Sequence, residues 1–154
     1  MQVSNCLKLL SVFALALASS AAAAQDPGRT VTPSELQWKS GRVPGLERAN
    51  IIREPGKPGP VVWRLKFPAN YTAQAHTYPD DRTYTILSGI WYLGWGTKFD
   101  EAKLKALPAG SFYAAPANVP HFFATKVEPV VVQVTGTEPS GVRFVDPAHA
   151  PKKQ

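Results

Sequence analysis

Proline is the residue that most restricts how this chain can fold. The sequence holds 15 prolines in 154 residues, roughly twice the usual share of about 5%. Each proline lacks a backbone N–H and clashes with the preceding turn of a helix, so this content disfavours long helices. A helical bundle is therefore not expected. The length, with 44% hydrophobic and 18% charged residues, predicts one globular domain instead.

Short β-like runs separated by turn residues fill the chain from about residue 61 onward. They cover residues 61–67, 72–78, 84–95, 111–115, 121–125, 130–135 and 142–145, and Ser88-Gly89 interrupts the third run. Spacings of about 8–12 residues between short strands are typical of a β-sandwich or barrel. One segment differs, because residues 99–107 hold helix formers behind Asp100, a suitable N-cap. We expect an all-β fold with a single helical excursion of about two turns.

The first 24 residues have the pattern of a secretory signal. A short head with Lys8 precedes an apolar run at 9–18, and small residues fill 19–24. The apolar run is shorter than the ~20 residues that a membrane span needs, so we expect cleavage after Ala24 and one mature domain at 25–154. The mature chain then holds no cysteine, which excludes thiol chemistry. We expect an exported protein, periplasmic or extracellular, with no stable membrane insertion after cleavage.

Charge and motif content exclude several other functions. The net charge is +6, but the basic residues do not cluster apart from Lys152 and Lys153, so no nucleic-acid partner is expected. The chain has no glycine-rich phosphate loop and no evident carboxylate pair for glycoside chemistry.

Histidine is the main candidate for chemistry, and the mature chain holds His76, His121 and His149. His149 lies in a tail rich in proline and alanine, where a solvated side chain is expected. His76 and His121 each follow a proline-containing turn near the start of a predicted strand, so the two could converge across a sandwich. Alternation along the first strand predicts that Gln74, His76 and Tyr78 share one face.

Two stretches of the chain resemble the two conserved motifs of the cupin superfamily. The first runs from His76-Thr77-Tyr78-Pro79 to Gly96, and the second runs from Gly110 through Pro116 to His121. The resemblance covers about residues 33–147 and is closest to small secreted single-domain bacterial cupins. It implies a jelly-roll barrel, the double-stranded β-helix, with a site inside the barrel mouth. It also implies pairing into a homodimer through edge strands.

The departures from the cupin pattern affect the metal ligands that the resemblance implies. Metal-binding cupins use two histidines and a glutamate from the first motif and one histidine from the second. Here the first and last histidines are His76 and His121, whereas Tyr78 replaces the middle histidine and Arg82 falls at the glutamate position. Two imidazoles are fewer than the three protein ligands of a catalytic metal site, and a cation at Arg82 opposes a divalent metal.

Three interpretations of this cluster stay open. In the first, Tyr78 or Asp81 replaces a lost ligand, and iron, manganese or zinc binds at His76, His121 and Tyr78. In the second, the site is metal-free and binds a small anionic or hydroxylated ligand, with Arg82 suited to a carboxylate. In the third, the site is a relic with hydrogen-bonded histidines.

We therefore expect an exported protein that binds a small ligand in the barrel mouth. The candidate ligand-binding residues are Gln74, Tyr78, Arg82 and Trp91. Trp91 alternates with Leu93 and Trp95 and either stacks on a sugar or aromatic ligand or fills the core or a dimer face. The alternatives are a metal-dependent oxygenase or isomerase, and a non-catalytic relic or protein-interaction module.

Overall fold

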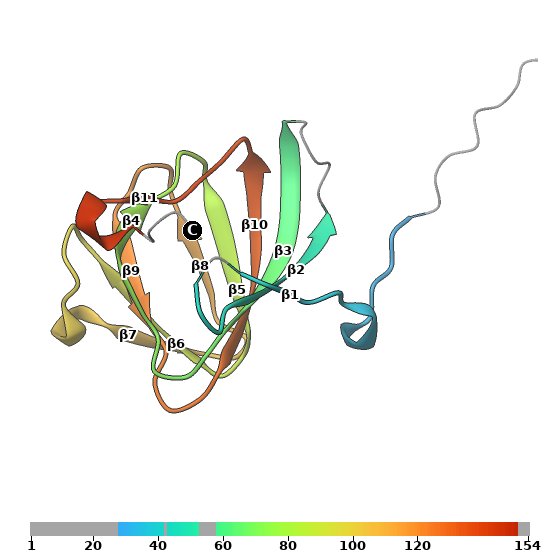
Figure 1. The fold of residues 1–154 in the computed structure, drawn as a ribbon, viewed down its shortest axis with the longest axis horizontal. Coiled ribbons are helices and arrows are strands. Elements are labelled where there is room, and N and C mark those ends of the chain that lie inside the picture. Colours follow the sequence, from blue (N-terminus) through green and yellow to red (C-terminus); the bar gives the residue numbers. More distant parts are fainter. Residues whose placement is uncertain (1–27, 42, 53–57, 151–154) are drawn as a thin grey trace, which may run out of the picture. The chain divides into compact units, whose positions relative to one another are not determined.

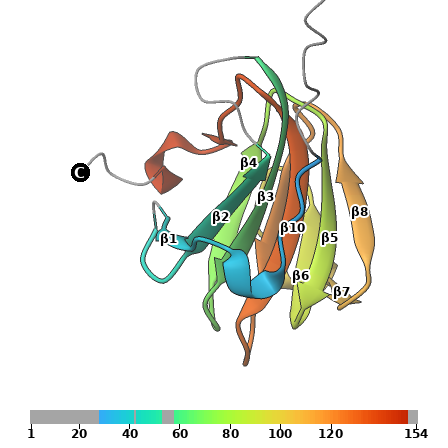
Figure 2. The ribbon, with the colours of Figure 1, turned by 90° about the vertical axis from the view of Figure 1, so that its right-hand side faces the viewer.

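The strands of this protein form two antiparallel sheets, which lie one behind the other in Figure 2. The computed structural model describes residues 28–41, 43–52 and 58–150. The strands are β1 (Lys39–Ser40), β2 (Glu47–Ile52), β3 (Gly59–Phe67), β4 (Thr72–Thr77), β5 (Arg82–Ser88), β6 (Ile90–Trp95), β7 (Lys105–Pro108), β8 (Phe112–Ala115), β9 (His121–Ala124), β10 (Val130–Glu138) and β11 (Arg143–Phe144). Three 3₁₀ turns complete the described elements: η1 (Pro33–Glu35), η2 (Glu101–Lys103) and η3 (Pro147–His149).

Strands distant in sequence lie side by side in both sheets (Figure 1). The six-stranded sheet has the order β1-β2-β3-β10-β5-β8, and the five-stranded sheet has the order β11-β4-β9-β6-β7. The predicted all-β fold is confirmed, and each predicted run contains an observed strand. The chain changes sheets between β5 and β6 at Gly89, whose φ is +75°. A Cβ at Gly89 would lie 2.7 Å from the Pro129 carbonyl oxygen, so this turn requires glycine.

The prediction of a two-turn helix over 99–107 is wrong. Only Glu101–Lys103 forms a 3₁₀ turn, and Asp100 caps it as expected by accepting a hydrogen bond from the Ala102 N–H at 3.1 Å. Residues Lys105–Pro108 instead pair with β6 as strand β7. Pairing with an available sheet edge outweighs the helix propensity of lysine, alanine and leucine in a segment this short.

The core lies between the two sheets and is built from alternating residues of their inner faces. It includes Val61, Trp63, Phe67, Tyr84, Ile86, Trp91, Leu93, Tyr113, Phe123, Val130, Val132 and Val134, each at most 8% exposed. In β10 the buried Val130, Val132 and Val134 alternate with more exposed residues, which is the two-residue period expected of a strand with one buried face. This packing fixes the positions of the polar side chains that enter the same interior.

The predicted secretory signal, residues 1–24, lies outside the described residues. The described residues from Val31 onward belong to one compact unit. No helix in the part of the chain that the structure describes has the length and hydropathy needed to cross a membrane.

Candidate functional site

Four aromatic side chains form a row across the five-stranded sheet. Phe144 of β11 pairs with His76 of β4, His76 pairs with His121 of β9, and His121 pairs with Trp95 of β6. The distances between successive ring centroids are 5.9, 4.6 and 5.7 Å. Directly paired residues of neighbouring strands project to the same face of a sheet. The register therefore places all four rings on one face, with the two histidines at the centre of the row.

The inward direction of His76 depends on a bulge in β4. The register between β4 and β9 shifts between Ala73 and His76. Both residues are buried, and Ala73 belongs to the core although it lies three positions from His76. A bulge adds one residue and breaks the two-residue alternation. The alternation expected for Gln74 and His76 is thus interrupted. The Gln74 carbonyl oxygen, rather than its side chain, contacts the His76 ring.

Both imidazoles are held in the same tautomer. His76 Nδ1 donates to the Gln74 carbonyl oxygen at 2.7 Å, and His121 Nδ1 donates to the Val119 carbonyl oxygen at 3.1 Å. A carbonyl oxygen only accepts, so each neutral ring carries its proton on Nδ1 and a lone pair on Nε2. Neither Nε2 has a hydrogen-bond partner in the described part of the chain. The pair therefore offers two acceptors to a ligand.

The surroundings keep both histidines uncharged. His76 is 3% exposed and His121 is 2% exposed. Burial, and then the proximity of His121, lower the pKa of His76 to about 4. Burial also lowers the pKa of His121, and the Arg82 cation lowers both values further. The opposing effect of the two carbonyl hydrogen bonds is smaller than that of burial. At neutral pH the site therefore contains two neutral bases.

A buried ion pair stands beside the histidines. Arg82 Nε donates to both carboxylate oxygens of Asp80 at 3.1 and 3.2 Å, and Arg82 Nη2 donates to Ser140 Oγ at 2.5 Å. The Ser140 hydroxyl in turn donates to Asp80, which also accepts from the Thr137 N–H at 3.0 Å. The side chains of Arg82 and Asp80 are only 7% and 9% exposed. Asp80 and Arg82 neutralise each other's charge, so Arg82 already has an ionic partner within the protein.

Two aromatic rings flank the Arg82 guanidinium. Its Cζ lies 3.5 Å from the centroid of the Tyr78 ring and 5.1 Å from that of Trp63. Tyr78 also lies beside both histidines, with ring centroids 5.4 Å from His76 and 5.9 Å from His121. Burial raises the pKa of the Tyr78 hydroxyl, although Arg82 opposes this shift. Tyr78 is therefore a neutral phenol whose ring covers a cation.

Two further tyrosines belong to this interior and were not predicted from the sequence. Tyr84 and Tyr113 are cross-strand partners whose rings stack with centroids 4.4 Å apart and planes at 3°. Burial raises the pKa of both hydroxyls well above their usual range, so both stay protonated. Alternation could have found Tyr84, because it lies two positions after Arg82 on β5 and therefore shares its face.

The predicted ligand-binding residue Trp91 lies deeper than the histidines. It is 1% exposed and stacks on Phe123 with ring centroids 3.9 Å apart. The Trp91 indole lies close enough to lower the pKa of the Tyr113 hydroxyl. Even so, neither the indole N–H nor the hydroxyl meets hydrogen-bond geometry with a described partner. Trp95, at the end of the same strand, is 42% exposed and is therefore more accessible to a ligand in solution than Trp91.

The available donors do not fit a tightly held divalent metal. His76 and His121 supply two nitrogens, whereas catalytic sites use three protein ligands. No group of three or more His, Cys, Asp or Glu side chains gathers in the described ranges. Asp81 is exposed, and its carboxylate accepts a hydrogen bond from the Ala117 N–H at 2.7 Å. Tyr78 keeps its proton, and the Arg82 cation repels a second positive charge. We therefore assign no chemical step to a metal.

Comparisons with known proteins rest on the fold. No protein-family model and no curated protein matches the chain. Among solved structures, the polyketide cyclase RemF from Streptomyces resistomycificus superposes with a TM-score of 0.67 and 19% identity, over 81% of this chain and 90% of that chain. An RmlC-like cupin from Ralstonia eutropha gives 0.61 and 14%, over 82% and 78% of the two chains. An RmlC-like cupin from Shewanella frigidimarina gives 0.57 and 13%, over 72% and 91%. The chain has the double-stranded β-helix fold of the RmlC-like cupin superfamily.

Proposed function

We propose that this protein binds a small ligand with hydroxyl groups at the mouth of the barrel, where His76 and His121 accept hydrogen bonds from it. One observation carries the proposal: Nδ1 of each imidazole is bonded to the backbone, while Nε2 has no hydrogen-bond partner among the described residues. Paired neutral acceptors of this kind recognise hydrogen-bond donors. Two adjacent acceptors favour a ligand with two hydroxyl groups over one with a single group.

The charge of the site favours a neutral ligand. Arg82 could have attracted a carboxylate, but Asp80 and Ser140 already accept hydrogen bonds from its Nε and Nη2. Removing that guanidinium from Asp80 would leave a buried carboxylate without its counter-ion, which is costly. The anionic ligand considered for Arg82 from the sequence is therefore less suitable here than a hydroxylated one.

Trp95 supplies an apolar wall for the same ligand. It is the cross-strand partner of His121 and is 42% exposed, so its ring can contact the carbon skeleton of a molecule bound to the two Nε2 atoms. Aromatic side chains beside hydrogen-bonding groups are common in small-molecule sites. The similarity to the polyketide cyclase supports a small organic molecule as the ligand class. At 19% identity it carries no activity over to this chain.

A titration with simple phenols tests the proposal. Catechol and phenol serve as donor probes, and anisole, which has no hydroxyl, serves as the matched control. We expect saturable chemical-shift changes at the histidine side chains with catechol, weaker changes with phenol and none with anisole. His76→Ala and His121→Ala should each weaken catechol binding by about tenfold, the equivalent of one lost hydrogen bond of about 1.4 kcal/mol.

The control variant is His149→Ala, because His149 belongs to η3 and is not part of the row. It should bind catechol as the wild type does. Equal binding of catechol and anisole, or unchanged binding in both His76→Ala and His121→Ala, would overturn the proposal.

A further inference from the structure

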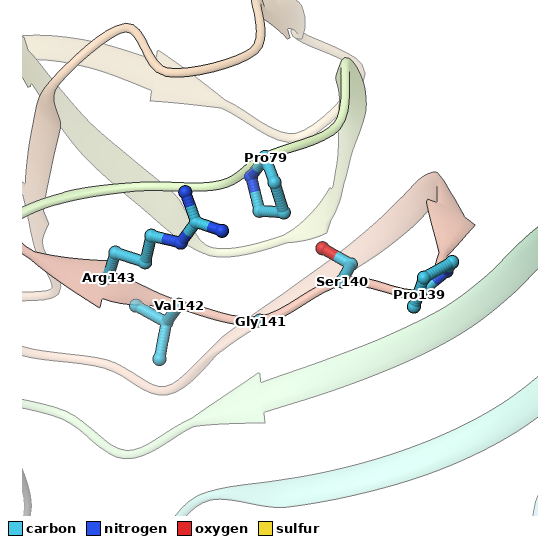
Figure 3. A pocket seen from close by; sticks show the side chains of 6 residues that line it. All are labelled: Pro79, Pro139, Ser140, Gly141, Val142 and Arg143. Carbon is cyan, nitrogen blue, oxygen red and sulfur yellow. The ribbon is translucent and has the colours of Figure 1, made fainter.

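A hollow lies beside the ion pair, on the side of β11 that faces away from the histidines. It has a volume of about 390 Å³ and is lined by Pro79, Pro139, Ser140, Gly141, Val142 and Arg143 (Figure 3). These residues come from the loop after β4, from the segment that joins β10 to β11, and from the first residue of β11. We call this hollow the Arg143 groove. The hollow is shallow and opens widely to solvent.

The Arg143 groove contains hydrogen-bond donors without acceptors. Arg143 is exposed, and its guanidinium forms no ion pair and no side-chain hydrogen bond with the described residues. In Figure 3 this guanidinium extends toward Pro79. The backbone N–H groups of Gly141 and Val142 also lack partners in the described part of the chain. A guanidinium and free amides together attract an oxyanion.

The acidic groups near the groove already accept hydrogen bonds from other residues of the protein. The Asp80 carboxylate is 9% exposed and accepts from Arg82, Ser140 and Thr137. The Glu138 carboxylate accepts from the Ser140 N–H at 2.8 Å, at the end of the groove nearest Pro139. Its negative charge favours placing a ligand's anionic group at the opposite end, next to Arg143.

The rest of the lining is apolar and therefore favours a ligand with an apolar body. Pro79, Pro139 and Val142 present carbon surface, and a Cβ built on Gly141 would meet nothing within 4 Å. We infer that the Arg143 groove binds a small organic monocarboxylate, with its carboxylate on Arg143 and its apolar body against the prolines and Val142. A single guanidinium balances a single negative charge, and the apolar walls disfavour a bare inorganic anion.

This groove is separate from the histidine site, so the inference does not depend on the proposed function. Arg143 and Phe144 are consecutive residues of β11, and consecutive side chains of a strand point to opposite faces. Phe144 packs on the His76 ring, whereas Arg143 lines the groove on the other side of the strand.

A calorimetric titration of the full chain with benzoate tests the inference. Benzamide has the same shape without the charge, and inorganic phosphate has charge without the apolar body. We expect benzoate to bind in the millimolar range, as an exposed charge pair allows, and to bind at least about tenfold more tightly than benzamide or phosphate. Phosphate binding as tight as benzoate would overturn the assignment of an organic ligand.

Variants distinguish the Arg143 groove from general attraction to a basic protein. Arg143→Gln should weaken benzoate binding by about tenfold, the loss expected for one charge-assisted hydrogen bond. Arg29→Gln removes the same charge from another exposed arginine and should leave binding unchanged. Glu138→Gln removes the opposing charge and should tighten binding. If Arg143→Gln and Arg29→Gln bind benzoate as the wild type does, or if the wild type shows no saturable binding, the inference fails.

Discussion

His76 and His121 are direct cross-strand partners with ring centroids 4.6 Å apart, and each ring donates its Nδ1 proton to the carbonyl oxygen two residues before it. The arrangement is the same on β4 and β9, so both rings present Nε2 as an acceptor. Burial keeps both rings neutral, which prevents the repulsion that two imidazolium ions at this distance would suffer. The pair is thus stable only while it is uncharged, and acid should destabilise it.

The first prediction concerns this pH dependence. The folded-state pKa of His76 is about 4, against 6.5 for the unperturbed side chain. Between these values the unfolded chain binds a proton that the folded chain does not. The free energy of unfolding should therefore be highest above pH 6.5 and should fall as the pH drops toward 4. The contribution of His76 is at most about 3–4 kcal/mol, since each pKa unit is worth about 1.36 kcal/mol.

Urea denaturation at neutral and at acidic pH measures this loss. His76→Gln should reduce the difference between the two conditions, because glutamine does not titrate. His149→Gln, a variant of an exposed tail residue, should keep the wild-type dependence. An acid sensitivity that is identical in His76→Gln and the wild type would contradict the assignment.

The second prediction concerns the missing metal ligand. Tyr78 lies beside both histidines, so Tyr78→His should supply a third imidazole to the same space. We expect zinc to bind this variant about tenfold or more tightly than the wild type, because three nitrogen ligands suffice for a zinc site. Competition with a chromogenic chelator measures the affinity. Tyr78→Phe is the control, and equal zinc affinity in the two variants would show that the third ligand cannot reach the histidines.

The third prediction concerns the buried ion pair. Asp80→Ala should destabilise the protein by about 3–5 kcal/mol, because it leaves the Arg82 guanidinium buried without a counter-ion. The Lys126–Glu101 pair, 3.3 Å apart, offers an exposed comparison with side chains 45% and 73% exposed. Glu101→Ala should cost less than about 1 kcal/mol. Thermal or urea denaturation of the two variants compares the losses, and similar values would be inconsistent with a buried pair.

The fourth prediction concerns the backbone behind that ion pair. A Cβ added at Gly136 would lie 2.6 Å from Asp80 Oδ2 and 3.3 Å from Arg82 Cγ. Gly136→Ala should therefore displace the ion pair and destabilise the protein by about 1–3 kcal/mol, the usual cost of overpacking. Gly141→Ala, with no atom within 4 Å of its Cβ, should change the stability little. A Gly136→Ala variant as stable as Gly141→Ala would contradict the close approach.

Much of the fold was predictable because hydrophobic alternation along the chain follows the inner faces of the sheets. The runs that became β3, β4, β9 and β10 each combine β-branched or aromatic residues with flanking turn residues. Strand β7 was not predictable, since Lys105–Pro108 has a helix-like composition and becomes a strand only by pairing with β6. Such tertiary pairing is not visible in local propensity.

The candidate site was predictable only in part. His76 and His121 were singled out by the resemblance to the cupin motifs and by the turn that precedes each of them. The strand register confirms that the two residues are paired. Ser140 was not found, because it reaches Arg82 across 58 positions of sequence and lies in a loop with no distinguishing motif. The bulge in β4 was also hidden, since the pattern Gln74, His76 and Tyr78 fits an uninterrupted strand.

The short strand β11 connects the histidine site and the Arg143 groove. This strand pairs with β4 through only two residues, Arg143 and Phe144. Arg143 lines the Arg143 groove, and Phe144 packs on the His76 ring. The two residues are consecutive in the strand, so their side chains project from opposite faces of β11. Because one two-residue strand holds both side chains, the place of Phe144 on His76 and the place of Arg143 in the groove depend on the same pairing with β4.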